Sequence, residues 1–500
     1  MPTILGQYIQ GKTQLSNSSA KRRTITNPAT GEPIGEVEFA GEAELEAAVA
    51  SAKQAFTTWS TTPPLKRARI LAKFKELLEK NQDKLAALVT QEHGKTIEDA
   101  KGSVGRGIEL VEFMCGIPHL LKGDYSENVG PSIDCYTIRQ PIGLCAGVSP
   151  FNFPVMVPLW MIIPAIACGN CFILKPSEQD PSAPLFLAQL LTEAGLPDGV
   201  LSVLNGDKQV VDALIKHPAI STMTAVASTP VAQYIYQQSI LAGKRAHTFG
   251  GAKNHGIVMP DADLESTAEA LAGAAFGSAG ERCMAISVAV VVGDDTADTL
   301  TPLIAEKARN LKIGPGNQPG LDMGPLVSQT HLERVKHYID IGVKEGATLV
   351  VDGRERKFPE NPEGYFLGAS VFDHVTPLMK IYQEEIFGPI LVIVRVYDFE
   401  QALSLINQNP FGNGTTIFTQ NGETAHSFAQ NVQVGMVGIN VPIPVPVAYH
   451  PFGGWKQSVF GDLNMHGDQS VQFYTKTKTV TMRWPNTSHA VSGFIMPHVK

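Results

Sequence analysis

From about residue 141 onward, short apolar runs alternate with segments of helix length, and this alternation restricts the fold more than any other feature. The runs include "GLCAGVSP", "CFILKPS", "VLSVLNG" and "ISTMTAVAS". Strands that alternate with helices are typical of a parallel sheet covered on both faces. Because a doubly wound sheet binds ligands at the carboxyl ends of its strands, we expect the functional residues to follow these runs.

A second alternation, from "HGIVMPDADL" through "SVAVVVG" to "GPILVIVRVYDF", predicts a second α/β domain. Residues 41–60 and 65–96 carry apolar residues at helical spacing. The stretch "SIDCYTIRQP" and the tail "VQFYTKTKTVTMRW" are rich in Thr, Tyr and Val, which favours strands, and we expect these strands to serve assembly. A chain of 500 residues is too long for one compact domain. We therefore expect a first domain from residues 1–122 and 141–247, a second from 248–440, an assembly element from 123–140 and 468–500, and a connecting segment at 441–467.

The overall charge and the apolar runs exclude several classes of partner. A formal net charge of -8 gives no bulk attraction to nucleic acid or to an anionic membrane. The N-terminal residues carry no export signal, so a cytoplasmic location is expected. The run "VMVPLWMIIPAIAC" is shorter than a membrane helix and contains Pro158 and Pro164, so we interpret it as a buried helix.

The six cysteines of this long chain are expected to be free thiols. Cys168 and Cys171 form a CxxC pair, but no second Cys or His pair follows at ligand spacing, so we favour two core thiols and expect no metal. Cys283, in "FGSAGERCMA", fits two interpretations. The small residues before it and the neighbouring Arg282 suit an accessible thiolate nucleophile, whereas free cysteines are often simply buried.

Polar residues at two predicted strand ends suggest a catalytic and nucleotide-binding edge. Asn152 in "SPFNFP" suits the stabilisation of an oxyanion, and the alternative is a helix cap. Lys175 and Glu178 in "ILKPSEQDP" suit ribose hydroxyls, and a carboxylate there favours NAD over NADP; the alternative is a solvated ion pair. No G-x-G-x-x-G follows any predicted strand, so an ordinary dinucleotide fold is not indicated.

Together, "SPFNFP", "ILKPSE", "FGSAGERC", "EEIFGP" and "HPFGGWKQS" resemble the aldehyde dehydrogenase superfamily in order and spacing, over nearly the whole chain. The stretches "EHGKTIEDA", "GERCMA" and "GGAKNH" look like its CoA-acylating methylmalonate-semialdehyde dehydrogenase branch. The resemblance implies an atypical Rossmann NAD-binding domain, an α/β catalytic domain and a small β element for homo-oligomerisation. It also implies NAD as cofactor and CoA as co-substrate.

The resemblance assigns roles to particular residues. It makes Cys283 the nucleophile that forms a thiohemiacetal and then a thioester, and Asn152 the oxyanion donor. It implies that a carboxylate on the substrate meets Arg106 and Arg282, which suits bidentate guanidinium recognition. The implied cofactor contacts are Ser149, Phe151, Lys175, Glu178, Ser228, Glu385 and Phe387.

One departure from the family pattern bears on the reaction. Hydrolytic relatives carry a glutamate that activates water, and alignment on Lys253 puts Phe249 in its place. Without that base, CoA rather than water is expected to take the acyl group, although a phenylalanine there also serves as packing. The alternatives are a hydrolytic aldehyde dehydrogenase that releases a free acid, a non-catalytic member of the fold, and a thiol hydrolase without cofactor.

Other points stay open at the level of sequence. Ala227 and Ala232 replace two glycines that face the pyrophosphate in relatives, which leaves the effect on cofactor binding undecided. His93 lies far from the other motifs in the sequence, and we do not expect it to be catalytic. The preference between malonate and methylmalonate semialdehyde depends on a single methyl group. The choice between dimer and tetramer and the pathway served, whether valine, inositol or β-alanine breakdown, are not determined.

Overall fold

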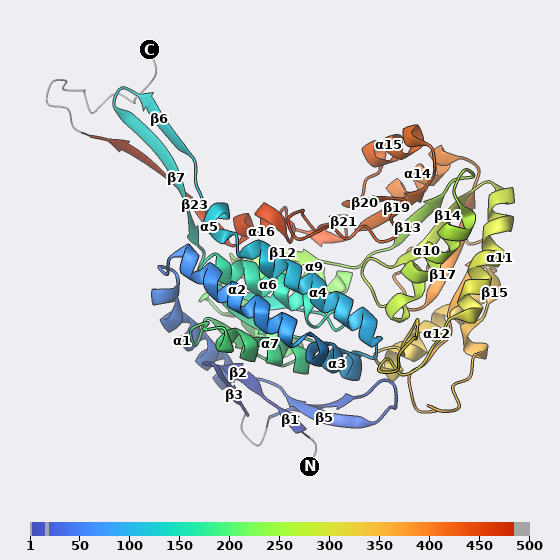
Figure 1. Ribbon diagram of the computed structural model, residues 1–500, viewed down its shortest axis with the longest axis horizontal. Coiled ribbons are helices and arrows are strands. Elements are labelled where there is room, and N and C mark those ends of the chain that lie inside the picture. The colour runs from blue at the N-terminus through green and yellow to red at the C-terminus, as the bar shows by residue number, and fades with distance from the viewer. Residues whose placement is uncertain (1–2, 16–19, 485–500) are drawn as a thin grey trace.

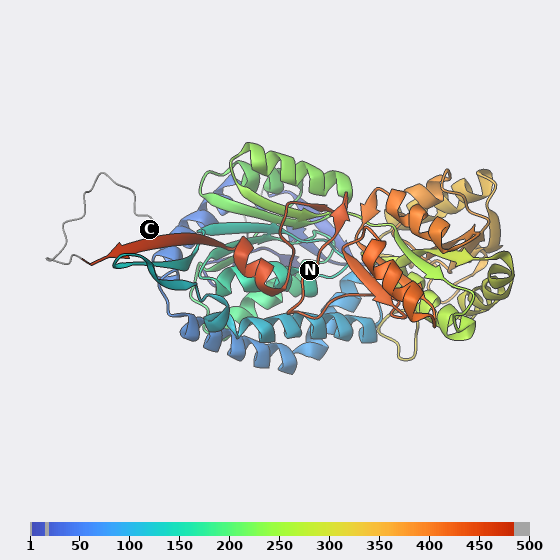
Figure 2. The same cartoon turned by 90° about the horizontal axis from the view of Figure 1, so that it is seen from above.

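The computed structural model describes residues 3–15 and 20–484. Two large sheets lie side by side with helices on their faces, and a narrow three-stranded sheet projects from one end (Figures 1 and 2). The part of the expected assembly element that spans residues 485–500 lies outside the described residues.

The first large sheet has eight strands in the order β22-β12-β11-β8-β9-β10-β2-β3. Its five central strands are parallel, and β22, β2 and β3 extend it with antiparallel pairing. The chain runs from β8 to β9 and β10 on one side and then returns to β11 on the other side of β8, which creates a topological switch point. The strands are β2 (Gln7–Ile9), β3 (Lys12–Gln14), β8 (Leu144–Val148), β9 (Cys171–Lys175), β10 (Leu201–Val203), β11 (Ile220–Val226), β12 (Arg245–Phe249) and β22 (Val459–Phe460).

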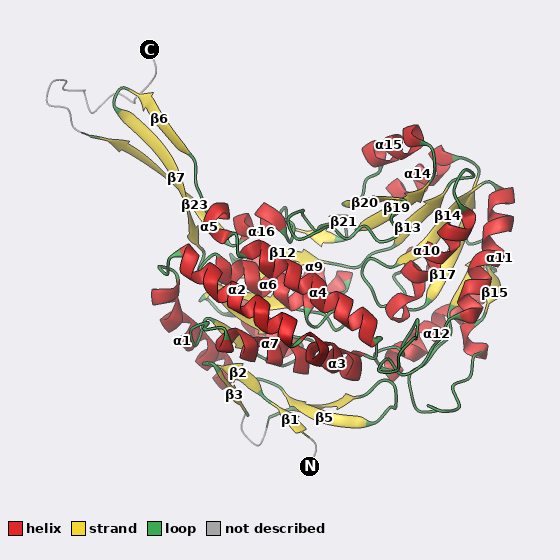
Figure 3. Cartoon of the chain, in the orientation of Figure 1, coloured by secondary structure: helices red, strands yellow, loops and turns green. Residues whose placement is uncertain are grey.

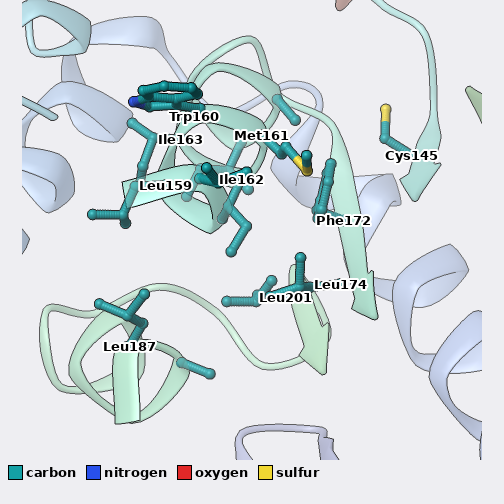
Figure 4. Close-up of a cluster of buried hydrophobic side chains, with 14 of the residues drawn as sticks. Cys145, Leu159, Trp160, Met161, Ile162, Ile163, Phe172, Leu174, Leu187 and Leu201 are labelled. Atoms are coloured by element: carbon teal, nitrogen blue, oxygen red, sulfur yellow. The ribbon is translucent and has the colours of Figure 1, made fainter. Parts of the chain in front are cut away.

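Helices cover both faces of this sheet (Figure 3). The apolar run at 155–168 forms α6, and every residue of this helix is buried, as its hydrophobicity on all sides predicts. Figure 4 shows Leu159, Trp160 and Ile162 of α6 in one buried cluster with Phe172 and Leu174 of β9. The helices are α1 (Glu42–Trp59), α2 (Pro64–Lys80), α3 (Gln82–His93), α4 (Ile97–Met114), α5 (Ile117–Leu120), α6 (Met156–Ala167), α7 (Ser182–Glu193), α8 (Lys208–Lys216), α9 (Thr229–Leu241) and α16 (Gly467–Phe473).

The second large sheet has seven strands in the order β15-β16-β17-β14-β13-β19-β20, and all but β15 are parallel. Its buried residues form a hydrophobic core separate from that of the first sheet. The strands are β13 (Asn254–Val258), β14 (Ile286–Val292), β15 (Thr348–Val351), β16 (Ser370–Asp373), β17 (Ile390–Val396), β19 (Gly414–Phe418) and β20 (Met436–Ile439). The helices are α10 (Leu264–Phe276), α11 (Asp294–Asn310), α12 (Gln329–Lys344), α13 (Lys380–Gln383), α14 (Phe399–Gln408) and α15 (Gly422–Asn431).

The projecting sheet pairs β23 (Thr475–Arg483) with β7 (Ile133–Pro141) and β7 with β6 (Tyr125–Gly130), all antiparallel. The prediction of strands in these two distant segments is confirmed, with one correction. The tail was expected to be extended from Val471, but residues up to Phe473 belong to helix α16, which packs on α6 and buries Val471 and Phe473. Smaller sheets join β1 (Thr3–Leu5), β5 (Pro33–Glu38) and β4 (Arg22–Thr26), and β18 (Phe411–Gly412) with β21 (Trp455–Lys456).

Within the described ranges, no helix combines the length and apolar character that crossing a bilayer requires. All six cysteines are free, and burial raises the pKa of both Cys168 and Cys171 to about 12. The interpretation of this pair as core thiols between α6 and β9 is therefore consistent with their environment.

Candidate functional site

A cleft of about 460 Å³ opens at the carboxyl ends of β8, β9, β11 and β12, at the switch point of the first sheet. Its volume lies in the ordinary range for small-molecule sites. The second sheet contributes the opposite wall through the loops that precede β14 and β17. The predicted site residues that line this one cleft are Ser149, Phe151, Asn152, Lys175, Glu178, Ser228, Cys283, Glu385 and Phe387.

Cys283 lies on a sharply turned loop between α10 and β14. Shortly before it in the chain, Ser278, Ala279 and Gly280 have φ of 54°, 52° and 73°. Left-handed backbone at the two non-glycine residues is a source of strain. The carbonyl of Cys283 accepts hydrogen bonds from Asn254 Nδ2 at 2.8 Å and from Asn413 Nδ2 at 3.0 Å. These two amides fix the backbone that carries the thiol.

The Cys283 thiol is partly buried, and burial is the main reason why its pKa rises to about 12. The nearby Glu385 carboxylate raises the pKa further, whereas backbone hydrogen bonds from Cys283 and Met284 and, to a smaller extent, Lys95 lower it. The sequence suggested Arg282 as a cation beside the thiol, and the structure shows the Arg282 guanidinium donating to Asp99. A thiol with this pKa is protonated at neutral pH, so nucleophilic attack requires its deprotonation.

The side chain of Asn152 does not cap the helix that follows it. Its Nδ2 donates to the Glu281 backbone oxygen at 3.0 Å, which places the amide beside the segment that carries Cys283. The backbone oxygen of Asn152 accepts a hydrogen bond from Lys95 Nζ at 2.7 Å. Contacts on both the side chain and the main chain thus hold this amide at the cleft.

Lys175 and Glu178 form an ion pair, but Lys175 is buried rather than solvated, and both residues line the cleft. Lys175 Nζ lies 3.1 Å from Glu178 Oε2, and Arg23 Nη1 lies 3.1 Å from Glu178 Oε1. Burial opposes ionisation of Glu178, but the two cations outweigh it and lower the carboxyl pKa. An ionised carboxylate that accepts hydrogen bonds therefore faces the cleft at the end of β9.

Glu385 and Phe387 approach the same space from the second sheet. Glu385 Oε1 accepts a hydrogen bond from the Ala252 N–H at 2.9 Å, and burial raises its carboxyl pKa. Phe387 has a φ of 62°, and its ring meets the Phe151 ring edge to face at 5.9 Å. Because a phenylalanine is costly at positive φ, its position is enforced by the surrounding structure.

The two arginines expected to bind a substrate carboxylate are not among the residues that line the cleft. Arg106, on α4, donates to the Val445 carbonyl at 2.9 Å and pairs with Glu109 at 2.7 Å. Arg282 Nη2 donates to Asp99 Oδ1 at 2.6 Å. The structure therefore places neither guanidinium on the wall of this cleft.

The departures from the family pattern have clear positions. Phe249 ends β12 and is buried in the core of the first sheet, and no titratable side chain stands at this position. Ala227 lines the cleft, and Ala232 is buried on α9.

The ring of His93, which is distant in sequence, lies 5.8 Å from that of Phe151. Burial keeps the pKa of His93 well below its usual value, so it is uncharged at neutral pH.

Sequence reasoning missed several residues around the site. Lys95 and Asp99 belong to "EHGKTIEDA", which supported the family resemblance but suggested no role for them. His331 and Arg334, on α12, line the cleft without belonging to any quoted motif. Only "EHGKTIEDA" offered a signal, because it places a lysine and an aspartate four residues apart in the sequence.

The fold and this cleft define an aldehyde dehydrogenase, and comparison with known families agrees. The aldehyde dehydrogenase family model matches residues 15–480, so the chain belongs to this family. A malonate-semialdehyde dehydrogenase of Pseudomonas aeruginosa is 55% identical over 474 residues, which cover 95% of each chain.

Solved structures extend the comparison. A methylmalonate-semialdehyde dehydrogenase of Oceanimonas doudoroffii is 54% identical, with a TM-score of 0.96 over 97% of this chain and 99% of the other. A protein of Sinorhizobium meliloti, provisionally named as the same enzyme and solved with NAD, is also 54% identical. Its TM-score is 0.96 over 98% of this chain and 99% of the other. The predicted fold class is thereby confirmed.

Proposed function

We propose that the protein oxidises methylmalonate semialdehyde and malonate semialdehyde with NAD and CoA, and releases propionyl-CoA or acetyl-CoA, NADH and CO₂. One observation carries this proposal. Cys283 and Asn152 line the same cleft, and strand β12 ends beside it at Phe249, where hydrolytic relatives carry a glutamate. The names of the most similar relatives support the substrate class.

The residues of the cleft fit NAD. The Ser149 hydroxyl is buried without a hydrogen-bond partner among the described residues, which suits a polar ligand. We propose that Lys175 and Glu178 hold ribose hydroxyls, that Ser228 and Glu385 make further polar contacts, and that Phe151 and Phe387 pack beside the nicotinamide. A Cβ added at Gly250 would crowd the Gln457 carbonyl and Thr229, and one added at Gly251 would meet the Glu385 carboxylate, so this part of the cleft wall has little room for a side chain. When bound, NAD supplies the hydride acceptor.

The chain's own residues provide the covalent chemistry. The Cys283 thiolate attacks the aldehyde carbon, and the Asn152 amide together with the Cys283 N–H stabilises the oxyanion. After oxidation, the acyl group is a thioester on Cys283. The CoA thiol attacks that carbonyl, the bond to Cys283 Sγ breaks, and the thiol proton is returned to Cys283. Water does not compete well for the thioester, because no carboxylate at position 249 activates it. The carboxylate β to the carbonyl leaves as CO₂, and the remaining carbon takes up a proton.

We propose that Arg106 and Arg282 recognise the substrate carboxylate. Arg282 is adjacent to Cys283 in sequence, and Asp99 accepts a hydrogen bond from its guanidinium. To serve as an anchor, it must share its donors between Asp99 and the substrate, which its planar, multidentate fork permits.

The decisive measurement is NADH formation with each semialdehyde, with and without CoA, beside a Cys283→Ala variant. We expect sustained turnover only with CoA and none in the variant. Equal turnover without CoA would favour the hydrolytic alternative, and activity in Cys283→Ala would exclude the cysteine mechanism.

We also propose that the chain forms a homo-oligomer through the projecting sheet. This sheet stands away from both cores, and Tyr125, Val129 and Ile138 are exposed on it (Figure 1). Light scattering after size exclusion distinguishes monomer, dimer and tetramer, and a monomer at micromolar concentration would contradict the proposal.

A further inference from the structure

Helix α12 directs three polar side chains at the loop that contains residues 384–387. These side chains stand at positions 331, 334 and 338, a spacing that places them on one face of the helix. Three hydrogen bonds join this face to the loop: from His331 Nε2 to the Phe387 carbonyl at 2.7 Å, from Arg334 Nη2 to the Glu385 carbonyl at 3.0 Å, and from the Tyr338 hydroxyl to Glu384 Oε2 at 2.6 Å. One helix face therefore fixes this loop at three points.

The contact to Phe387 restrains an unfavourable backbone conformation. Phe387 has a φ of 62°, in a region that bulky residues rarely adopt. Because a carbonyl oxygen only accepts hydrogen bonds, Nε2 of His331 carries the proton. Burial lowers the pKa of His331, so the ring is neutral at neutral pH and Nδ1 carries no proton. The ring thus has a single N–H, and the Phe387 carbonyl accepts it.

The same nitrogen lies near a second acceptor but does not bond to it. Glu281 Oε1 is 3.6 Å from His331 Nε2, which is beyond hydrogen-bond length, and it accepts the Val327 N–H at 3.1 Å. Glu281 stands two residues before Cys283 in the chain. His331 therefore lies between the loop of Cys283 and the loop of Phe387, and its hydrogen bond goes to the second.

The His331 ring also packs beside two aromatic residues of the cleft. Its centre lies 6.3 Å from that of Phe151 and 6.4 Å from that of Phe387, and both contacts are edge to face. All three rings line the cleft. A substitution of His331 can therefore act in two ways, through the loss of the N–H donor or through the loss of the ring.

We infer that His331 is a positioning residue, which holds Phe387 through the hydrogen bond to its main chain and thereby places the nicotinamide of NAD. This inference rests on the proposed function, in which NAD binds in the cleft with Phe387 beside the nicotinamide. Because Phe387 is strained, release of its carbonyl allows the main chain to relax and its ring to move. His331 acts through Phe387, and its role requires no contact of its own with the cofactor.

Two variants of His331 separate the hydrogen bond from the ring. His331→Gln keeps an N–H donor without a ring, and His331→Phe keeps a ring without a donor. His337→Phe is the matched control, because His337 is an exposed histidine on the same helix.

The readout is the Kd of NAD and of ADP-ribose, which is NAD without its nicotinamide, measured by isothermal titration calorimetry. Loss of one hydrogen bond shifts an equilibrium by about threefold to tenfold. We expect His331→Phe to bind NAD more weakly by that factor and to bind ADP-ribose as the wild type does. His331→Gln should bind NAD within about twofold of the wild type, and His337→Phe should match the wild type with both ligands.

Wild-type affinity for NAD in His331→Phe would overturn the inference. An equal loss in His331→Gln would do the same, since it would assign the effect to the ring. A matching loss of affinity for ADP-ribose would also overturn it, because His331 would then act on the rest of the cofactor.

Two further outcomes remain distinguishable. If His331→Phe does not fold, wild-type affinity of His331→Gln for NAD would support the inference, and a loss would contradict it. Because binding of NAD needs no aldehyde, absence of NADH formation from either semialdehyde would reject the proposed function without affecting this result.

Discussion

Replacing Asp99 by asparagine should destabilise the protein far more than a typical change of a helical carboxylate. Burial opposes ionisation of Asp99, yet Lys95 and Arg282 together lower its pKa from 3.8 to about 2. That change corresponds to about 2.4 kcal/mol in favour of the ionised form at neutral pH. Because the folded-state pKa is the lower one, this stability is fully present above pH 4 and is lost as the pH falls through about 2.

At pH 7, Asp99→Asn therefore loses about 2.4 kcal/mol from the ionisation of the carboxylate. Lys95 is then left buried without a carboxylate, so we expect a total loss of about 3–5 kcal/mol in the free energy of unfolding. The assay is urea unfolding at pH 7, and the control is Asp83→Asn. Asp83 pairs with Lys101 at 2.8 Å but is exposed, so its loss should cost under about 1 kcal/mol. The reasoning is refuted if the two variants unfold at the same urea concentration.

Three further predictions concern the pH dependence and the site. Burial raises the pKa of Glu92 from 4.5 to about 7, so the stability that this group contributes is full below pH 4.5 and is lost as the pH rises through 7. Between pH 5 and 8, thermal unfolding of wild type and Glu92→Gln should show that the free energy of unfolding changes with pH by about 2–3 kcal/mol less in the variant. Gly251→Ala places a Cβ against the Glu385 carboxylate, which should raise the KM for NAD at least several-fold in steady-state assays. Arg106→Gln should raise the KM for malonate semialdehyde about tenfold or more and leave propionaldehyde oxidation unchanged.

Controls and contrary outcomes are available for each of the three. A wild-type pH dependence in Glu92→Gln would show that the carboxyl ionises normally. Gly273→Ala, on α10, has nothing within 4 Å of the added Cβ and should leave the KM for NAD unchanged. Glu109→Gln removes the ion-pair partner of Arg106 and should retain substrate affinity. An equal rise in KM for both aldehydes in Arg106→Gln would argue against carboxylate recognition.

The two α/β sheets and the buried helix at 155–168 were predictable from the sequence, because their signals are local. A buried parallel strand is a short apolar run, and an enclosed helix is apolar on every face, so each pattern has one main interpretation. The tail was predicted less accurately. Val471 and Phe473 resemble strand residues, but their burial against α6 favours a helix.

The sequence by itself determined which residues stand at strand ends, and therefore that Asn152, Lys175 and Glu178 share one edge of a sheet. Only the tertiary structure decided that Lys95 donates a hydrogen bond to the Asn152 carbonyl and that Asp99 accepts one from Arg282. The physical reason is the separation in sequence of the residues that interact. Strand ends follow from local periodicity, whereas an ion pair between residues 183 positions apart depends on which faces of separate elements meet in the folded chain.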